Sequence, residues 1–153
     1  MRMDVTDSAA ALAAESSIVA LRAQRPEFVR FTQGSHDALL VPADEAGLSR
    51  YERAAVAHRV AALGRDAALE AHYRTLMLGA GAPPAGARLA AVLEHAERVA
   101  TAPGSATPEH LRALEAAGLS AQAIVALSQL IAFVAYQIRV VAGLRLLAQE
   151  ARA

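Results

Sequence analysis

Apolar residues recur at helical spacing along most of the chain, and no stretch shows the strict alternation of apolar and polar positions that marks a half-buried strand. The residues that favour helices, Ala, Leu, Arg and Glu, are abundant, and Gly and Pro punctuate the pattern between them. The pattern predicts helices over residues 8–22, 26–40 with a break at Gly34, 48–63, 66–77, 87–100 and 108–117, and a long final helix after Ser120. We therefore expect an all-α helical bundle of about six or seven helices.

The stretch Leu48 to Met77 predicts two helices with a tight joint, around which the rest of the chain is organised. Ser49 is a suitable N-cap, and Glu52 three residues later completes a capping box. Gly64 suits the left-handed position after a helix end, and Asp66 can cap the next helix. If the chain has a reactive pocket, we expect this hairpin to line it.

The final predicted helix is apolar over more than one face. Its apolar positions alternate three and four residues apart, at Ile124, Leu127, Ile131, Val134, Ile138 and Val141. Such a seam suits antiparallel packing in a bundle or at a subunit contact. Residues 119–138 carry no charge, but Gln and Ser interrupt them and Arg139 follows directly, so a buried core helix is favoured over a membrane span.

Composition excludes several classes of function. The formal net charge is zero, so nucleic-acid binding is not indicated. The absence of cysteine excludes disulfides, thiolate metal sites and a thiol nucleophile. The N-terminal residues carry acidic groups and lack the apolar core of a secretory signal, and we expect a cytoplasmic protein without a membrane segment.

Several short motifs together resemble the carboxymuconolactone decarboxylase (CMD) and alkylhydroperoxidase D-like superfamily, near its uncharacterised peroxidase-related group. Leu48-Ser49-Arg50-x-Glu52-Arg53, followed by Ala57 and Ala62-Leu63, is similar to the superfamily's LSxxERExxAxxxxALN helix. The residues around Ala96-Glu97-Arg98, Ala117-Gly118-Leu119-Ser120 and Phe133-x-x-x-Gln137-x-Arg139 also fit. The resemblance implies one domain over residues 1–153, with a core of about 25–147 and an N-terminal helical extension of 1–24. It also implies a homo-oligomer, as a dimer, trimer or hexamer.

The peroxidase members of this superfamily use a Glu, a Cys-x-x-Cys pair and a following His. Aligned without gaps from the Leu-Ser start, these positions fall here on Ala54, on Asp66 and Leu69, and on Tyr73. A thiolate must attack the peroxide and a second thiol must resolve the product, and no shift of register supplies sulfur. Thiol peroxidase activity is therefore not expected.

The decarboxylase branch does not depend on cysteine, and its helix pair resembles Ala62-Leu63-Gly64-Arg65 followed by His72-Tyr73-Arg74. This resemblance makes His72 the candidate general acid or base, with Tyr73 and Glu52 as further candidate catalytic residues. The candidate substrate-binding residues are Arg65, Arg74, Arg139 and His58. The acidic residues that the branch carries between Arg and His are replaced here by Ala67 and Ala68.

Each of these residues also has a purely structural interpretation. His72 can be a hydrogen-bonded and inert histidine near a helix joint, and Tyr73 can be a packing aromatic. His58 and His72 would need a third ligand to hold a metal, so no metal and no cofactor is predicted. His95 and His110 lie among glutamates and are expected to be solvated, while His36 falls in a polar break.

The leading functional prediction is a non-peroxidatic CMD-domain protein that binds a small ligand or acts as an accessory protein in a redox or catabolic pathway. The alternative is a cofactor-free decarboxylase or isomerase of a small carboxylate or lactone, with His72 as acid or base. The expected ligand is a small carboxylate or a hydrophobic molecule. A third alternative is a structural partner that pairs with a cysteine-bearing paralogue.

Overall fold

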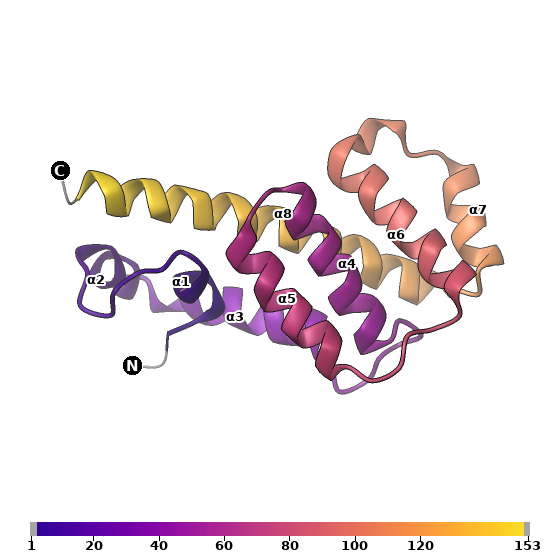
Figure 1. Cartoon of the computed structure of the whole chain (residues 1–153), viewed down its shortest axis with the longest axis horizontal. Coiled ribbons are helices and arrows are strands. Elements are labelled where there is room, and N and C mark those ends of the chain that lie inside the picture. The colour runs from indigo at the N-terminus through magenta and orange to yellow at the C-terminus, as the bar shows by residue number, and fades with distance from the viewer. Residues whose placement is uncertain (1–2, 152–153) are drawn as a thin grey trace.

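The structure is a computed structural model that describes residues 3–151, and within this range it is all-helical. The described residues form eight α-helices and one short 3₁₀ helix. Figure 1 shows how the helices are arranged. In chain order they are α1 (Val5–Ala9), α2 (Ser17–Ala23), α3 (Pro26–Leu40), α4 (Arg50–Leu63), α5 (Ala67–Gly79), α6 (Gly86–Thr101), η1 (Pro103–Ser105), α7 (Pro108–Ala116) and α8 (Ala121–Glu150). The predicted all-α class is confirmed, and the helix count is close to the predicted six or seven.

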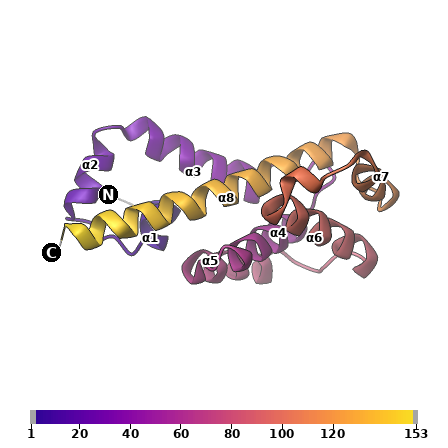
Figure 2. The same cartoon turned by 90° about the horizontal axis from the view of Figure 1, so that it is seen from above.

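Helix α8 runs the length of the molecule, with α3 along one side and α4 to α6 along the other (Figure 2). Four of the six residues of its predicted seam are at most 1% exposed, namely Leu127, Ile131, Val134 and Val141, and the other two, Ile124 and Ile138, are half-buried. Length and composition alone would allow α8 to cross a membrane, and no other helix within residues 3–151 passes that test. Since its buried face packs into the core of a helical bundle, the structure favours a core helix.

The α4–α5 hairpin begins with the predicted capping box. The backbone N–H of Ser49 donates to Glu52 Oε2 at 2.8 Å, and the backbone N–H of Glu52 donates to Ser49 Oγ at 3.2 Å. The Asp66 carboxylate accepts from the backbone N–H of Leu69 at 3.0 Å, so the predicted cap of α5 is also confirmed. Leu69 and Tyr73 of α5 are fully buried in the core, and the hairpin contacts α8 chiefly through α4.

The joint of this hairpin differs from the prediction in one respect. Gly64 has an ordinary negative φ of −76°, and Arg65 takes the left-handed conformation instead, with a φ of +56°. Gly64 is needed for space, because a Cβ atom there would lie 2.7 Å from Ile138 Cδ1 of α8. The glycine therefore permits a close approach of α4 to α8 and is not required by its backbone angles.

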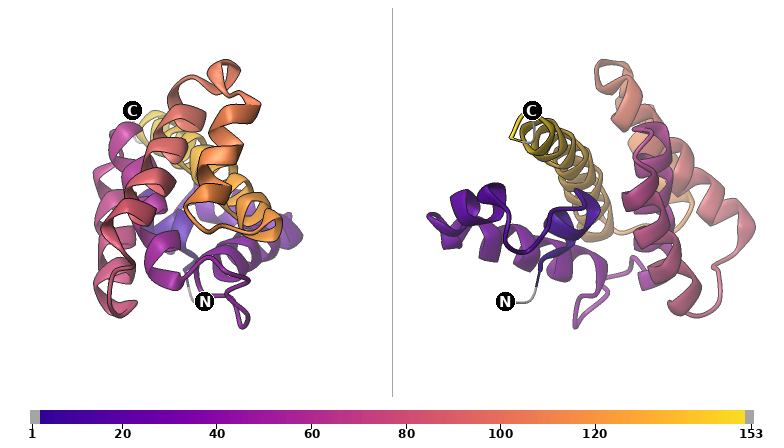
Figure 3. Two further views of the ribbon diagram at one scale, coloured as in Figure 1. Left: turned by 90° about the vertical axis from the view of Figure 1, so that its right-hand side faces the viewer. Right: turned by 60° about the vertical axis from the view of Figure 1, so that its left-hand side comes forward.

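Two predictions for the N-terminal half are wrong. The helix predicted over 8–22 is two helices, because Ala11 has a positive φ and Ser16 caps a new helix by accepting from the backbone N–H of Val19. Helix α3 is continuous through Gly34, where an exposed glycine costs some stability without ending the helix. Figure 3 shows α1 to α3 towards one end of the molecule, away from α6 and α7.

Candidate functional site

An open pocket of about 670 Å³ lies between α1, α3 and α5. Three other pockets on the described residues are smaller, with volumes of about 320, 180 and 310 Å³. The pocket between α1, α3 and α5 is lined by Met3, Asp4, Val5, Ser8 and Ala9 around α1, by Val29, Arg30, Gln33 and Asp37 of α3, and by Ala68, Ala71, His72 and Thr75 of α5. The expectation that the hairpin lines a pocket is met through α5, which contributes His72.

His72 is paired with His36, which the sequence had placed in a polar break. Their Nε2 atoms are 2.9 Å apart, and the ring centroids are 5.1 Å apart. His36 lies within α3, is only 4% exposed, and also packs against the rings of Tyr73 and Phe133. The prediction that His36 falls in a polar break is wrong, because α3 is continuous here and the fold brings its His36 against His72 of α5.

The pair continues through α3 towards α1. His36 Nδ1 lies 2.9 Å from Asp37 Oδ1, and Gln33 Nε2 donates to the same oxygen at 2.7 Å. Gln33 Oε1 accepts from the backbone N–H of Val5 at 2.9 Å. One hydrogen-bonded chain therefore connects the start of α1 to the imidazole that faces the pocket.

Burial, and to a smaller extent the neighbouring His36, lowers the pKa of His72 from 6.5 to about 4. His72 is therefore neutral at pH 7. A neutral imidazole offers one donor and one acceptor, so His72 is equipped to bind a ligand or accept a proton, and not to act as a general acid at neutral pH.

Tyr73 faces the core and not the pocket. Its side chain is fully buried, and its hydroxyl donates a short hydrogen bond to Gln137 Oε1 of α8. Gln137 Nε2 in turn donates to Thr6 Oγ1 of α1 at 3.5 Å. Burial raises the pKa of Tyr73 far above its ordinary range, which keeps the hydroxyl protonated as a donor. This geometry supports the structural interpretation of Tyr73.

Glu52 lies at the start of α4, and it does not line the pocket. Arg88 Nε of α6 donates to Glu52 Oε1 at 2.6 Å, and the side chain is 1% exposed. Burial by itself would raise the pKa of Glu52, but hydrogen bonds from Arg88 and Ser49 hold it below its ordinary value. Glu52 is thus a charged anchor between α4 and α6.

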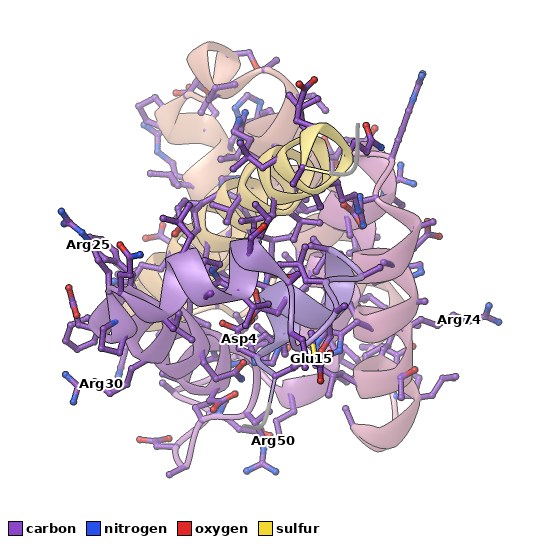
Figure 4. The ribbon with its side chains drawn as sticks, turned by 90° about the vertical axis from the view of Figure 1, so that its left-hand side faces the viewer. Asp4, Glu15, Arg25, Arg30, Arg50 and Arg74 are labelled. Atoms are coloured by element: carbon purple, nitrogen blue, oxygen red, sulfur yellow. The ribbon has the colours of Figure 1, made fainter. Side chains whose placement is uncertain are left out.

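The four residues predicted to bind a substrate lie outside the pocket lining. Arg65 is exposed at the hairpin joint, and Arg74 projects outwards from α5 (Figure 4). Arg139 is exposed and donates to the backbone oxygen of Ala135 in its own helix. His58 faces Glu70 across the hairpin, with 3.6 Å between Nε2 and Oε1. The structure does not bring these side chains together with His72.

Metal-binding groups do not converge in the part of the chain that the structure describes. Within residues 3–151, His, Asp and Glu side chains form no group of three that could hold a metal ion. His95, predicted to be solvated, is instead 6% exposed, because it lies on the buried side of α6 with Val92 and Ala96.

The comparisons with known proteins support the fold and leave the function open. No protein-family profile and no curated protein matches the chain. Among solved structures, the chain is similar to an uncharacterized peroxidase-related protein from Silicibacter sp. TM1040, with a TM-score of 0.60 and 16% sequence identity. The match covers 78% of this chain and 69% of that chain. The fold is similar to that of a peroxidase-related protein. At 16% identity the likeness concerns the arrangement of the helices alone.

Proposed function

We propose that this chain is a cysteine-less, non-peroxidatic relative of the CMD and alkylhydroperoxidase D-like proteins that binds a small ligand in the pocket between α1, α3 and α5. The observation that carries the proposal is the combination of a pocket of about 670 Å³ with a neutral, hydrogen-bonded histidine in its wall. Ligand pockets of this size range usually combine an apolar lining with a few polar groups that orient the ligand.

The fold and the missing sulfur together favour binding over peroxide chemistry. The similar structure is peroxidase-related. By the motif resemblance, the two thiol positions of the peroxidase members correspond to Asp66 and Leu69 of this hairpin. Asp66 is occupied as a helix cap and by Arg145, whose Nη1 lies 2.7 Å from its Oδ2. The hairpin has thus kept its scaffold without any group that cycles electrons. An accessory role in a cytoplasmic redox or catabolic pathway is consistent with such a protein.

A thermal-shift screen of small carboxylates, alcohols and hydroperoxides tests the proposal. A ligand that raises the melting temperature is expected to lose this effect in Ala71→Phe, because residue 71 lines the pocket. Ala67→Phe is the matched control, since Ala67 is also exposed on α5 and does not line the pocket. A ligand that stabilises both variants equally would place binding elsewhere and would contradict the proposal.

A second candidate function, a cofactor-free decarboxylase or isomerase, is favoured by the position of His72 alone. An unprotonated imidazole in the wall of a pocket can take a proton from a carbon acid. Solvent deuterium should then enter a bound carbon acid with the unmodified protein and not with His72→Gln. Equal exchange with both proteins would remove this candidate.

We also propose that the chain forms a homo-oligomer. Several large apolar side chains of α3 and α8 are exposed, namely Phe28, Phe31, Val125, Tyr136, Leu146 and Leu147. Apolar side chains exposed in such numbers on adjoining helices are typical of an association surface. The mass in solution, measured by light scattering, checks this proposal, and a strict monomer at high concentration would contradict it.

A further inference from the structure

The hydrogen atoms of the Asp37, His36 and His72 chain can be assigned from the bonding partners. A carboxylate only accepts hydrogen bonds, so the 2.9 Å contact between Asp37 Oδ1 and His36 Nδ1 requires a hydrogen on that nitrogen. The opposite tautomer would direct a nitrogen lone pair at the carboxylate. The arrangement therefore selects the tautomer of His36 that carries hydrogen on Nδ1.

The assignment of His36 determines that of His72. In the neutral form of the ring, His36 with hydrogen on Nδ1 has a lone pair on Nε2, which lies 2.9 Å from His72 Nε2. This contact is a hydrogen bond only if His72 Nε2 is the donor. The Nδ1 atom of His72 then carries no hydrogen. Among residues 3–151, the hydrogen bond of the His72 side chain is made by Nε2. The Nδ1 atom therefore remains available as an acceptor, and the His72 side chain lines the pocket.

We propose that Asp37 and His36 hold His72 in the tautomer with hydrogen on Nε2, so that the pocket binds a ligand through an O–H or N–H group donated to His72 Nδ1. The ligand class is that of alcohols, phenols and amides with a small apolar body, because the lining includes apolar side chains such as Val5, Val29 and Ala71. This inference rests on the proposed function, since it names the ligand chemistry of the same pocket. His36 and Asp37 act as positioning residues.

Nitrogen-15 spectra of histidine-labelled protein test the tautomers without any ligand. We expect His36 to carry hydrogen on Nδ1, the less common tautomer of free histidine, and His72 to carry it on Nε2. Gln33 Nε2 lies 3.5 Å from His36 Nδ1 in the unmodified protein. In Asp37→Ala this amide becomes the remaining hydrogen-bond donor to His36 Nδ1, so both tautomers should reverse. Ser35→Ala, an exposed neighbour on α3, is the control and should leave them unchanged. A His72 with hydrogen on Nδ1 in the unmodified protein, or unchanged tautomers in Asp37→Ala, would overturn the positioning role.

Titrations with phenol and anisole test the ligand class, since anisole has the same ring and lacks the donor hydrogen. Phenol is expected to shift the His72 Nδ1 signal and to bind about fivefold more tightly than anisole or better, as one hydrogen bond contributes about 1 kcal/mol. Equal binding of the two probes would overturn the ligand class. If neither probe binds, the ligand class fails, while the thermal-shift screen decides the proposed function and the tautomer spectra decide the role of Asp37 and His36.

Discussion

The buried histidine pair makes the stability of the protein depend on pH in a definite direction. In the folded chain the pKa of His72 is lowered from 6.5 to about 4, by burial first and by His36 second. In the unfolded chain His72 titrates near its ordinary pKa of about 6.5. Between these two values the unfolded chain binds more protons. The contribution of His72 to the free energy of unfolding is therefore complete above about pH 6.5 and is lost as the pH falls towards 4.

The size of the loss follows from the two pKa values. A difference of about 2.5 corresponds to about 3 kcal/mol if it applies in full. His72 is only partly buried and lines an open pocket, so solvent screening reduces the figure to about 1–2 kcal/mol. In a chain of this length that loss lowers the melting temperature by about 2–8 °C.

Urea denaturation between about pH 7.5 and pH 4.5 measures the loss, with His72→Gln as the comparison. The unmodified protein should lose about 1–2 kcal/mol more than the variant over this interval. The lowered pKa of His95 is common to both proteins, so its effect cancels in the difference. His58→Gln is the control, because His58 lies on the same hairpin outside the pocket, and it should keep the pH dependence of the unmodified protein. Parallel stability curves for the unmodified protein and His72→Gln would refute the reasoning.

Two further substitutions test the core around the hairpin. Tyr73→Phe removes the donor to Gln137 Oε1 at a fully buried site and should lower the free energy of unfolding by about 1–3 kcal/mol. Urea denaturation measures this loss, with Tyr51→Phe as the control. An unchanged stability would contradict the importance of this hydrogen bond. Gly64→Ala places a Cβ atom 2.7 Å from Ile138 Cδ1 and should cost about 1–3 kcal/mol, most of which should return when the double variant with Ile138→Val is made. No recovery in the double variant would show that the cost arises elsewhere.

The features that could be predicted from the sequence are those decided within a few residues. Ser49, Asp66 and Ser120 accept hydrogen bonds from backbone N–H groups three residues ahead, so their side chains identify the helix starts directly. The three- and four-residue spacing of α8 likewise identifies its buried seam, because that spacing is set by the geometry of a single helix.

The pairing of His36 with His72 could not be predicted, because it depends on how α3 crosses α5. A weak signal exists, since Val29, Gln33, His36 and Leu40 recur at helical spacing and all face inwards. That pattern indicates a buried side of α3, and it does not say which helix covers it. Gly34 lies between Gln33 and His36 and predicts a break, which obscures the pattern.

Arg53 belongs to the Leu48-Ser49-Arg50-x-Glu52-Arg53 motif, but its structural role depends on contacts that only the fold shows. Its guanidinium donates to the backbone oxygens of Leu48, Leu39 and Glu45, at 2.8, 2.9 and 2.9 Å. These bonds hold the loop between α3 and α4 while leaving the charge 3% exposed. Loop carbonyls have no sequence signature, so a buried arginine that binds them cannot be distinguished in advance from a solvated one.

A ligand titration followed at the histidine side chains tests the central claim most directly, namely that the pocket beside His72 is the binding site. With nitrogen-15-labelled histidine, a compound found in the thermal-shift screen should move the His72 and His36 signals together and leave the signal of His110 of α7 unmoved. In Ala71→Phe the same compound should move none of the three signals. Saturable binding that leaves the His72 and His36 signals in place, or that persists unchanged in Ala71→Phe, would contradict the account.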